Sequence, residues 1–208
     1  FPGARFAIFA AIGSAVSTLE RVMLCQPAWP AYESCITFVG ARPVTAPTYV
    51  EDGWDINLTD LVEKLELRPK MLVLNSPSNP TGKVLSARGF REVLELAKRY
   101  RTVVLSDEVY TDYSRTPVPS VLQHSDVEAI YVNSFSKEFS MTGWRIAYAV
   151  ADKARIAKMR AIVETTLTNV PEIVQRAAIG ALKDSSREAD RARRQIWKRV
   201  DMACEELR

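Results

Sequence analysis

Short runs rich in β-forming residues alternate with longer stretches of helical periodicity along the whole chain. We predict strands at Val22–Cys25, Pro43–Ala46, Met71–Asn75, Thr102–Ser106, Ala129–Asn133 and Arg145–Val150. Several of these runs are continuously apolar, which is typical of strands buried on both faces of a parallel sheet. The alternation therefore predicts an α/β fold, in which an open, mostly parallel sheet carries helices on both faces.

Helical stretches separate the predicted strands and supply the two outer layers. We predict helices at Ala4–Glu20, Tyr32–Val39, Leu58–Leu67, Ser86–Tyr100, Asp152–Thr168 and Pro171–Leu207. In the fourth of these, Phe90, Val93, Leu94 and Ala97 form one apolar stripe, as in a helix that packs against a sheet. Asn57 is placed to cap the third helix.

Composition and charge are those of an ordinary globular domain. Hydrophobic residues make up 47% and charged residues 25% of the 208 residues, which is enough for one packed domain. The net charge of +3 is too small to indicate a nucleic-acid partner, and no apolar run is long enough to cross a membrane. The three cysteines have no metal-site spacing, so we expect no metal and a reducing, cytoplasmic location.

Both ends of the chain are predicted to be cut. The sequence begins at Phe1 without an initiator methionine and stops at Arg208 inside a helical pattern. We therefore expect residues 1–208 to be one domain of a longer protein, with a helix from about residue 171 leading toward a part that lies outside the chain.

Polar side chains gather where three predicted strands end. The segments concerned are 75–82, 106–110 and 134–145. Each has a common structural explanation when taken alone: Asn79 before a proline suits a turn, Asp107 suits a helix cap, and Lys137 suits a solvated loop. Because ligands of open α/β sheets bind at the carboxyl ends of the strands, the three segments together predict a binding site at one rim.

These segments together resemble the class I/II aminotransferases, which are fold-type I enzymes that depend on pyridoxal 5′-phosphate (PLP). The resemblance rests on Asn75–Gly82, Ser106–Tyr110, Ser134–Lys137 and Met141–Arg145, which occur in the order of the family. It covers nearly the whole chain and implies the large PLP-binding domain of the PLP-dependent transferase fold. It also implies that an N-terminal segment and a C-terminal small domain belong to the complete protein.

The resemblance implies a catalytic role for three residues. Lys137 would carry PLP as a Schiff base and move a proton at the substrate carbon. Asp107 would pair with the pyridine nitrogen and keep it protonated, so that the ring can accept electrons. Tyr110 would donate a hydrogen bond to the phenolic oxygen of the cofactor, with Asn79 as a second donor. Trp29 would stack on the ring rather than merely pack at the surface.

The resemblance also implies a phosphate site. Ser134 and Arg145 match the phosphate ligands of the family, and the guanidinium fork of arginine suits phosphate oxygens. Ser136 is a further candidate.

The phosphate site is completed by the start of the first predicted helix. Gly3, Ala4 and Arg5 would present backbone N–H groups, which favour an anion at a helix N-terminus. Ala4 stands where many relatives have serine or threonine, so one hydroxyl contact is expected to be missing. The side chain of Arg5 is a candidate to compensate for it.

The implied activity is transfer of an amino group between an amino acid and a 2-oxo acid, in a homodimer. The same residues would also serve a β- or γ-lyase, a racemase, a biosynthetic cyclase, or the PLP-sensing domain of a transcription regulator. The sequence does not assign the amino donor, the acceptor, the pathway or the contacts from a partner subunit. The arginine that clamps the substrate carboxylate in this family is expected outside the chain.

Overall fold

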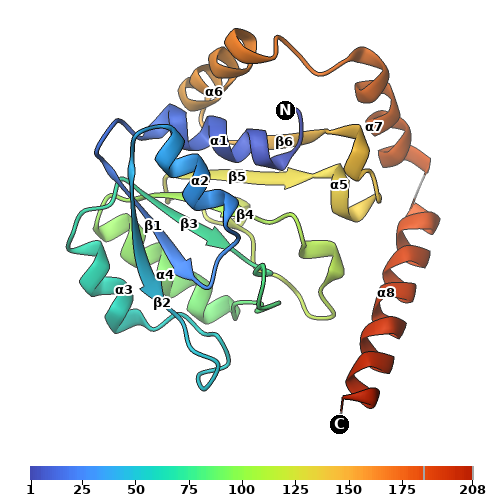
Figure 1. Ribbon diagram of the computed structural model, residues 1–208, viewed down its shortest axis with the longest axis horizontal. Coiled ribbons are helices and arrows are strands. Elements are labelled where there is room, and N and C mark those ends of the chain that lie inside the picture. The colour runs from blue at the N-terminus through green and yellow to red at the C-terminus, as the bar shows by residue number, and fades with distance from the viewer. Residues whose placement is uncertain (185, 208) are drawn as a thin grey trace.

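A single sheet organises the protein, and its strands are those expected from the sequence. The computed structural model describes residues 1–184 and 186–207. The strands are β1 (Arg21–Gln26), β2 (Arg42–Pro47), β3 (Met71–Asn75), β4 (Val103–Asp107), β5 (Ala129–Ser134) and β6 (Ala147–Val150). In the described chain their order is β2-β1-β3-β4-β5-β6, with β1 to β5 parallel and β6 antiparallel to β5 (Figure 1). The prediction of an open, mostly parallel sheet is confirmed.

Helices cover both faces of this sheet. They are α1 (Ala4–Ala15), α2 (Ala31–Phe38), α3 (Leu58–Leu65), α4 (Ala87–Arg99), α5 (Phe135–Glu138), α6 (Lys153–Thr166), α7 (Glu172–Asp184) and α8 (Ser186–Glu206). Helices α1, α2 and α6 pack on one face, whereas α3 and α4 pack on the other. Helix α8 extends away from the sheet (Figure 1). Across the described residues, none of the helices is both long and apolar enough to cross a membrane.

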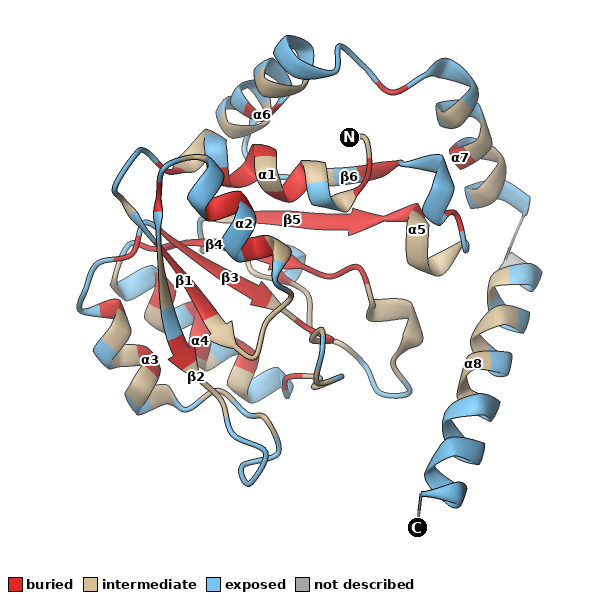
Figure 2. Ribbon diagram, viewed as in Figure 1, coloured by how far each residue is buried: buried red, intermediate tan, exposed pale blue. Residues whose placement is uncertain are grey.

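Successive residues of a strand pack into two separate hydrophobic cores, one on each face of the sheet. Val22 and Leu24 of β1 are buried with α1, α2 and α6, whereas Met23 between them is buried with α3 and α4. This alternation follows from the pleat, which directs successive side chains to opposite faces. Figure 2 shows the strands as the buried centre between more exposed helices. The continuous apolar runs in the sequence therefore reflect burial on both faces.

Local sequence explains where several helices form. In α4, Phe90, Val93, Leu94 and Ala97 are all buried, as their spacing predicts. The helix begins after Ser86, whose hydroxyl accepts a hydrogen bond from the Gly89 amide at 3.0 Å.

The first predicted helix was too long. Helix α1 ends at Ala15 instead of Glu20, because the backbone at Val16 becomes extended and the chain turns back toward β1. The region predicted as a helix over Pro171–Leu207 contains α7 and α8, and residue 185 between them lies outside the described part.

Strand β6 is shorter than predicted, since it begins at Ala147 and not at Arg145. Arg145 has a left-handed backbone with φ of 54°. That conformation is incompatible with a strand and turns the arginine toward the rim of the sheet.

Candidate active site

A hollow of about 580 Å³ lies at the carboxyl ends of β4 and β5, beside the start of α1. Its wall includes the predicted site residues Ala4, Arg5, Trp29, Asn79, Asp107, Tyr110, Ser134, Ser136, Lys137 and Arg145. Gly3 lies behind the wall, against the guanidinium of Arg145. The structure therefore brings together side chains that are up to 141 positions apart in the chain, from Ala4 to Arg145.

Asp107 is the buried carboxylate of this hollow. It is the last residue of β4 and only 3% of its surface is exposed. Its Oδ2 accepts a hydrogen bond from the Tyr32 hydroxyl at 2.6 Å, and its Oδ1 accepts a longer one from the Val109 amide at 3.3 Å. Burial raises the pKa of Asp107 to about 6, although these two hydrogen bonds oppose the rise.

Lys137 lies on α5, one short helical turn that follows β5 directly. The Ser134 hydroxyl caps this turn by accepting a hydrogen bond from the Ser136 amide at 3.1 Å. The Tyr113 hydroxyl donates to the carbonyl oxygen of Lys137 at 2.5 Å and fixes the end of the turn. The Lys137 ammonium nitrogen lies 5.3 Å from the centre of the Tyr110 ring, so the amine faces into the hollow.

The register between β3 and β4 places the amide groups of the site. Asn75 pairs with Asp107 across the two strands, and its side-chain amide donates to the Asp107 carbonyl oxygen at 2.9 Å. The Asn75 side-chain oxygen accepts from the Asn79 amide at 2.7 Å. Asn79 in turn lies 3.4 Å from the Tyr110 hydroxyl. Asn79 and Tyr110 are therefore held side by side.

Two arginines supply the positive charge of the hollow. The Arg145 guanidinium donates to the Thr142 carbonyl oxygen at 2.9 Å and lies against Gly3. Gly3 has φ of 87°, a backbone conformation that favours glycine at this position. The Arg5 guanidinium lies 5.0 Å from the centre of the Trp29 ring in a cation–π arrangement. Both cations line the end of the hollow formed by the first turn of α1.

Tyr32 is a wall residue that is not among the predicted site residues. It lies in the first turn of α2 and is 2% exposed. Its ring packs edge-on against Trp29, with ring centres 5.3 Å apart. The available signal was its position three residues after Trp29 at the start of a short helix, which turns both side chains toward the same rim.

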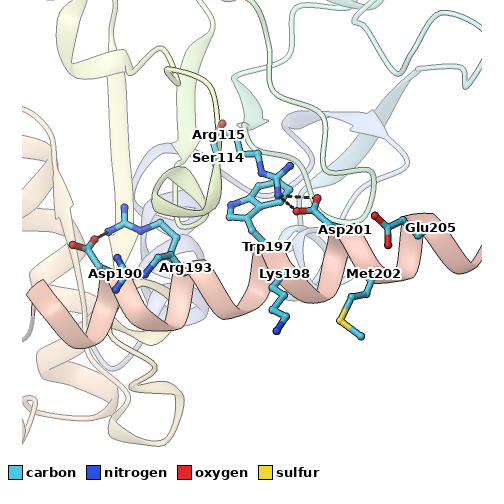
Figure 3. Close-up of a pocket in the computed structure, with 10 residues that line it drawn as sticks. Ser114, Arg115, Asp190, Arg193, Trp197, Lys198, Asp201, Met202 and Glu205 are labelled. Carbon is cyan, nitrogen blue, oxygen red and sulfur yellow. Dashed lines mark hydrogen bonds and ion pairs between the residues drawn. The ribbon is translucent and has the colours of Figure 1, made fainter.

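A second hollow, of about 620 Å³, lies between α8 and the segment at Ser114 and Arg115. Figure 3 shows Arg115 paired with Asp201 and lying over Trp197. The guanidinium makes two hydrogen bonds to this carboxylate, at 2.7 and 2.8 Å. These contacts join α8 to the segment at Ser114 and Arg115, and we interpret this hollow as a packing contact.

Comparison with known proteins shows the family of the chain. The model of the family "Aminotransferase class I and II" matches residues 1–208. The chain belongs to this family. Family members are PLP-dependent enzymes.

Individual family members resemble the chain over most of its length. The aspartate aminotransferase of Sulfolobus acidocaldarius is 38% identical over 186 residues, covering 86% of this chain and 46% of that protein. The structure of aspartate aminotransferase from Thermus thermophilus with maleate has a TM-score of 0.95 at 29% identity, covering 99% of this chain and 55% of that one. An aromatic aminotransferase from Pyrococcus horikoshii has a TM-score of 0.92 at 30% identity, covering 99% and 57%. The chain spans about half the length of the curated relatives it matches.

Proposed function

We propose that this chain is the cofactor-binding domain of a PLP-dependent aminotransferase, which moves an amino group between an amino acid and a 2-oxo acid. The observation that carries the proposal is the placement of the Lys137 amine and the buried Asp107 carboxylate on the wall of one hollow, together with two guanidinium groups. The amine would react with the aldehyde of PLP, the carboxylate would pair with its ring nitrogen, and the guanidinium groups would bind its phosphate.

The phosphate group fits the end of the hollow next to α1. Arg145 offers two or more N–H donors there, and the N-terminal turn of α1 adds backbone N–H groups from Ala4 and Arg5. Ser134 and Ser136 lie on the same wall. Gly3 supports this arrangement from behind, since it leaves room for the Arg145 guanidinium.

The ring fits between Trp29 and the carboxylate. The indole of Trp29 would cover one face of the pyridine, and Asp107 would accept a hydrogen bond from the ring nitrogen. Tyr110 and Asn79 are held side by side and would both reach the phenolic oxygen. When bound, PLP supplies an electron sink for the electron pair that is left on the substrate carbon.

The residues of this chain would then perform three tasks. Lys137 would hold the cofactor through its amine and would also move a proton at the substrate α-carbon. Asp107 stays ionised and holds a proton on the pyridine nitrogen. Tyr113 fixes the turn that carries Lys137 through the carbonyl oxygen of that residue, which keeps the amine aimed at the hollow.

The complete protein is proposed to contain more than this domain. We infer an N-terminal segment and a C-terminal small domain, reached through the helices from about residue 171, and a homodimer. Exposed apolar side chains on α7, namely Ile173, Ile179 and Leu182, support a surface that is covered in the complete assembly. A cytoplasmic location is supported by the free thiols of Cys25, Cys35 and Cys204.

Attachment of PLP to Lys137 tests the proposal directly. The full-length protein should absorb visible light with PLP bound, and borohydride should fix the cofactor to the peptide that contains Lys137. The variant Lys137→Ala should lose this attachment. Lys83→Ala serves as a control, because Lys83 is also largely buried but is paired with Asp55 at 2.6 Å.

Assays with amino donors and 2-oxo acceptors then test the reaction. Transamination by the full-length protein supports the proposal, whereas release of ammonia would indicate a lyase. Fixation of the cofactor on a lysine other than Lys137 would overturn the assignment of the site.

A further inference from the structure

The shortest side-chain hydrogen bond to Asp107 comes from a phenol that has no assigned role. The Tyr32 hydroxyl donates to Oδ2 of Asp107 at 2.6 Å, and both side chains are buried. The other carboxylate oxygen has the weaker contact, at 3.3 Å from the Val109 amide. Tyr32 is therefore the main direct constraint on the orientation of the Asp107 carboxylate.

The position of Tyr32 is itself fixed by α2 and by Trp29. The Tyr32 amide donates to the Trp29 carbonyl oxygen at 3.1 Å, and the two rings lie at 89° to each other. With 2% of its surface exposed, the phenol has little room to adopt another rotamer. The start of α2 thus positions both the Trp29 indole on the wall of the hollow and the Tyr32 hydroxyl that donates to Asp107.

This geometry leaves Asp107 able to accept a further hydrogen bond. Each carboxylate oxygen has two lone pairs, so a donor from Tyr32 on Oδ2 does not block a second donor from the hollow. The charged and titratable groups that act on Asp107 are Tyr32, Glu108 and Lys137, of which Glu108 disfavours the ionised carboxyl and the other two favour it. Among these, Tyr32 makes the direct side-chain hydrogen bond.

We propose that Tyr32 is a positioning residue, whose hydroxyl orients the Asp107 carboxylate and keeps it ionised so that it can hold a proton on the pyridine nitrogen of PLP. The proposal rests on the proposed function for the identity of the ring. Its structural part, the action of Tyr32 on Asp107, concerns this chain alone. Burial raises the pKa of Asp107 to about 6, so a modest change in its hydrogen bonding changes its charge at neutral pH.

The test is an infrared titration of the Asp107 carboxyl in the cofactor-free, full-length protein. The carboxyl band is assigned by its loss in Asp107→Asn. In Tyr32→Phe, we expect the titration midpoint to rise by about one unit, because a hydrogen bond to the ionised form is lost. Tyr131→Phe is the matched control: it also removes a buried phenol from this domain, but that phenol accepts from Asn133 and not from a group that acts on Asp107.

A second variant should shift the titration midpoint of Asp107 in the opposite direction while it keeps the Tyr32 hydroxyl. Replacing Tyr32 by 3-fluorotyrosine makes the phenol a stronger donor, so the Asp107 midpoint should fall. In the loaded enzyme, Tyr32→Phe should lower kcat about tenfold with little change in KM, and ¹⁵N-labelled PLP should show less protonation of its ring nitrogen.

The outcomes separate this proposal from the proposed function. An Asp107 midpoint that is the same in the wild type, in Tyr32→Phe and in the fluorotyrosine protein overturns the role of Tyr32, whatever the enzyme catalyses. Shifted midpoints in a protein that does not attach PLP at Lys137 would support the action of Tyr32 on Asp107 and overturn the proposed function instead.

Discussion

Replacing Asp107 by asparagine should stabilise the cofactor-free protein while it removes most of the activity. The carboxyl is 3% exposed, and burial raises its pKa from 3.8 to about 6. The folded state therefore disfavours the charged form of Asp107 more than the unfolded state does. Asparagine has nearly the same shape, keeps an oxygen that can accept from Tyr32, and carries no charge to bury.

The magnitude follows from the shift of the pKa. A rise of about two units corresponds to about 3 kcal/mol. Because the folded pKa is raised, this cost is absent well below pH 3.8 and fully present above about pH 6. The wild type thus loses stability relative to the variant as the pH rises through this window. The new amide N–H group of asparagine would face the Val109 amide, which reduces the net gain at pH 8 to between about 1 and 3 kcal/mol.

The assay is urea denaturation of the cofactor-free, full-length protein and its Asp107→Asn variant at pH 5 and pH 8. The advantage of the variant should be about 1.4 kcal/mol smaller at pH 5 than at pH 8, because Asp107 is mostly protonated in the folded state at pH 5. Asp126→Asn is the control, since Asp126 is an exposed partner of Lys98 at 2.6 Å and its removal should change stability only slightly. A variant that is less stable than the wild type at pH 8, or an advantage independent of pH, would refute the reasoning.

Two other substitutions test the phosphate site and the core. Arg145→Gln should weaken binding of PLP by about 10- to 100-fold, as measured by fluorescence titration of the cofactor-free protein, because charge-assisted hydrogen bonds to phosphate are lost; an unchanged affinity would exclude Arg145 from the phosphate site. Phe90→Ala should lower the free energy of unfolding by about 3–5 kcal/mol in urea denaturation, because Phe90 is fully buried between α4 and the sheet; a loss below about 1 kcal/mol would contradict the packing described for α4.

The sheet could be predicted from the sequence because burial on both faces leaves a simple pattern. The strand Met71–Asn75 was predicted with its observed bounds, and the other strands were displaced by one or two residues at an end. Helix ends were harder to predict. The end of α1 at Ala15 depends on the tertiary need to return to β1, and residues 16–20 have no strong breaker.

The candidate site could be predicted where its residues belong to segments with a recognisable order, such as those around Asp107 and Lys137. Tyr32 was missed because its role depends on a hydrogen bond to a residue 75 positions away, and its spacing from Trp29 indicates only the rim that it faces. The contact of Tyr113 with the Lys137 carbonyl oxygen, between residues 24 positions apart, depends in the same way on the fold. The roles of these residues depend on distances between segments that are far apart in the sequence, and only the fold sets those distances.

The burial of Asp107 connects the stability of the fold with the chemistry proposed for it. A carboxylate in water would hold the pyridine nitrogen weakly, because solvent screens the attraction between their charges. Burial strengthens that attraction but destabilises the cofactor-free protein. The raised pKa of Asp107 corresponds to a loss of about 3 kcal/mol in the free energy of unfolding when the carboxyl is ionised. The hydrogen bond from Tyr32 already keeps this cost lower than burial alone would make it and fixes the direction of the carboxylate, while leaving lone pairs for the cofactor. Binding of a cationic ring nitrogen would then relieve the remaining cost, so the same buried charge that weakens the cofactor-free protein should make PLP a strong stabiliser of the fold.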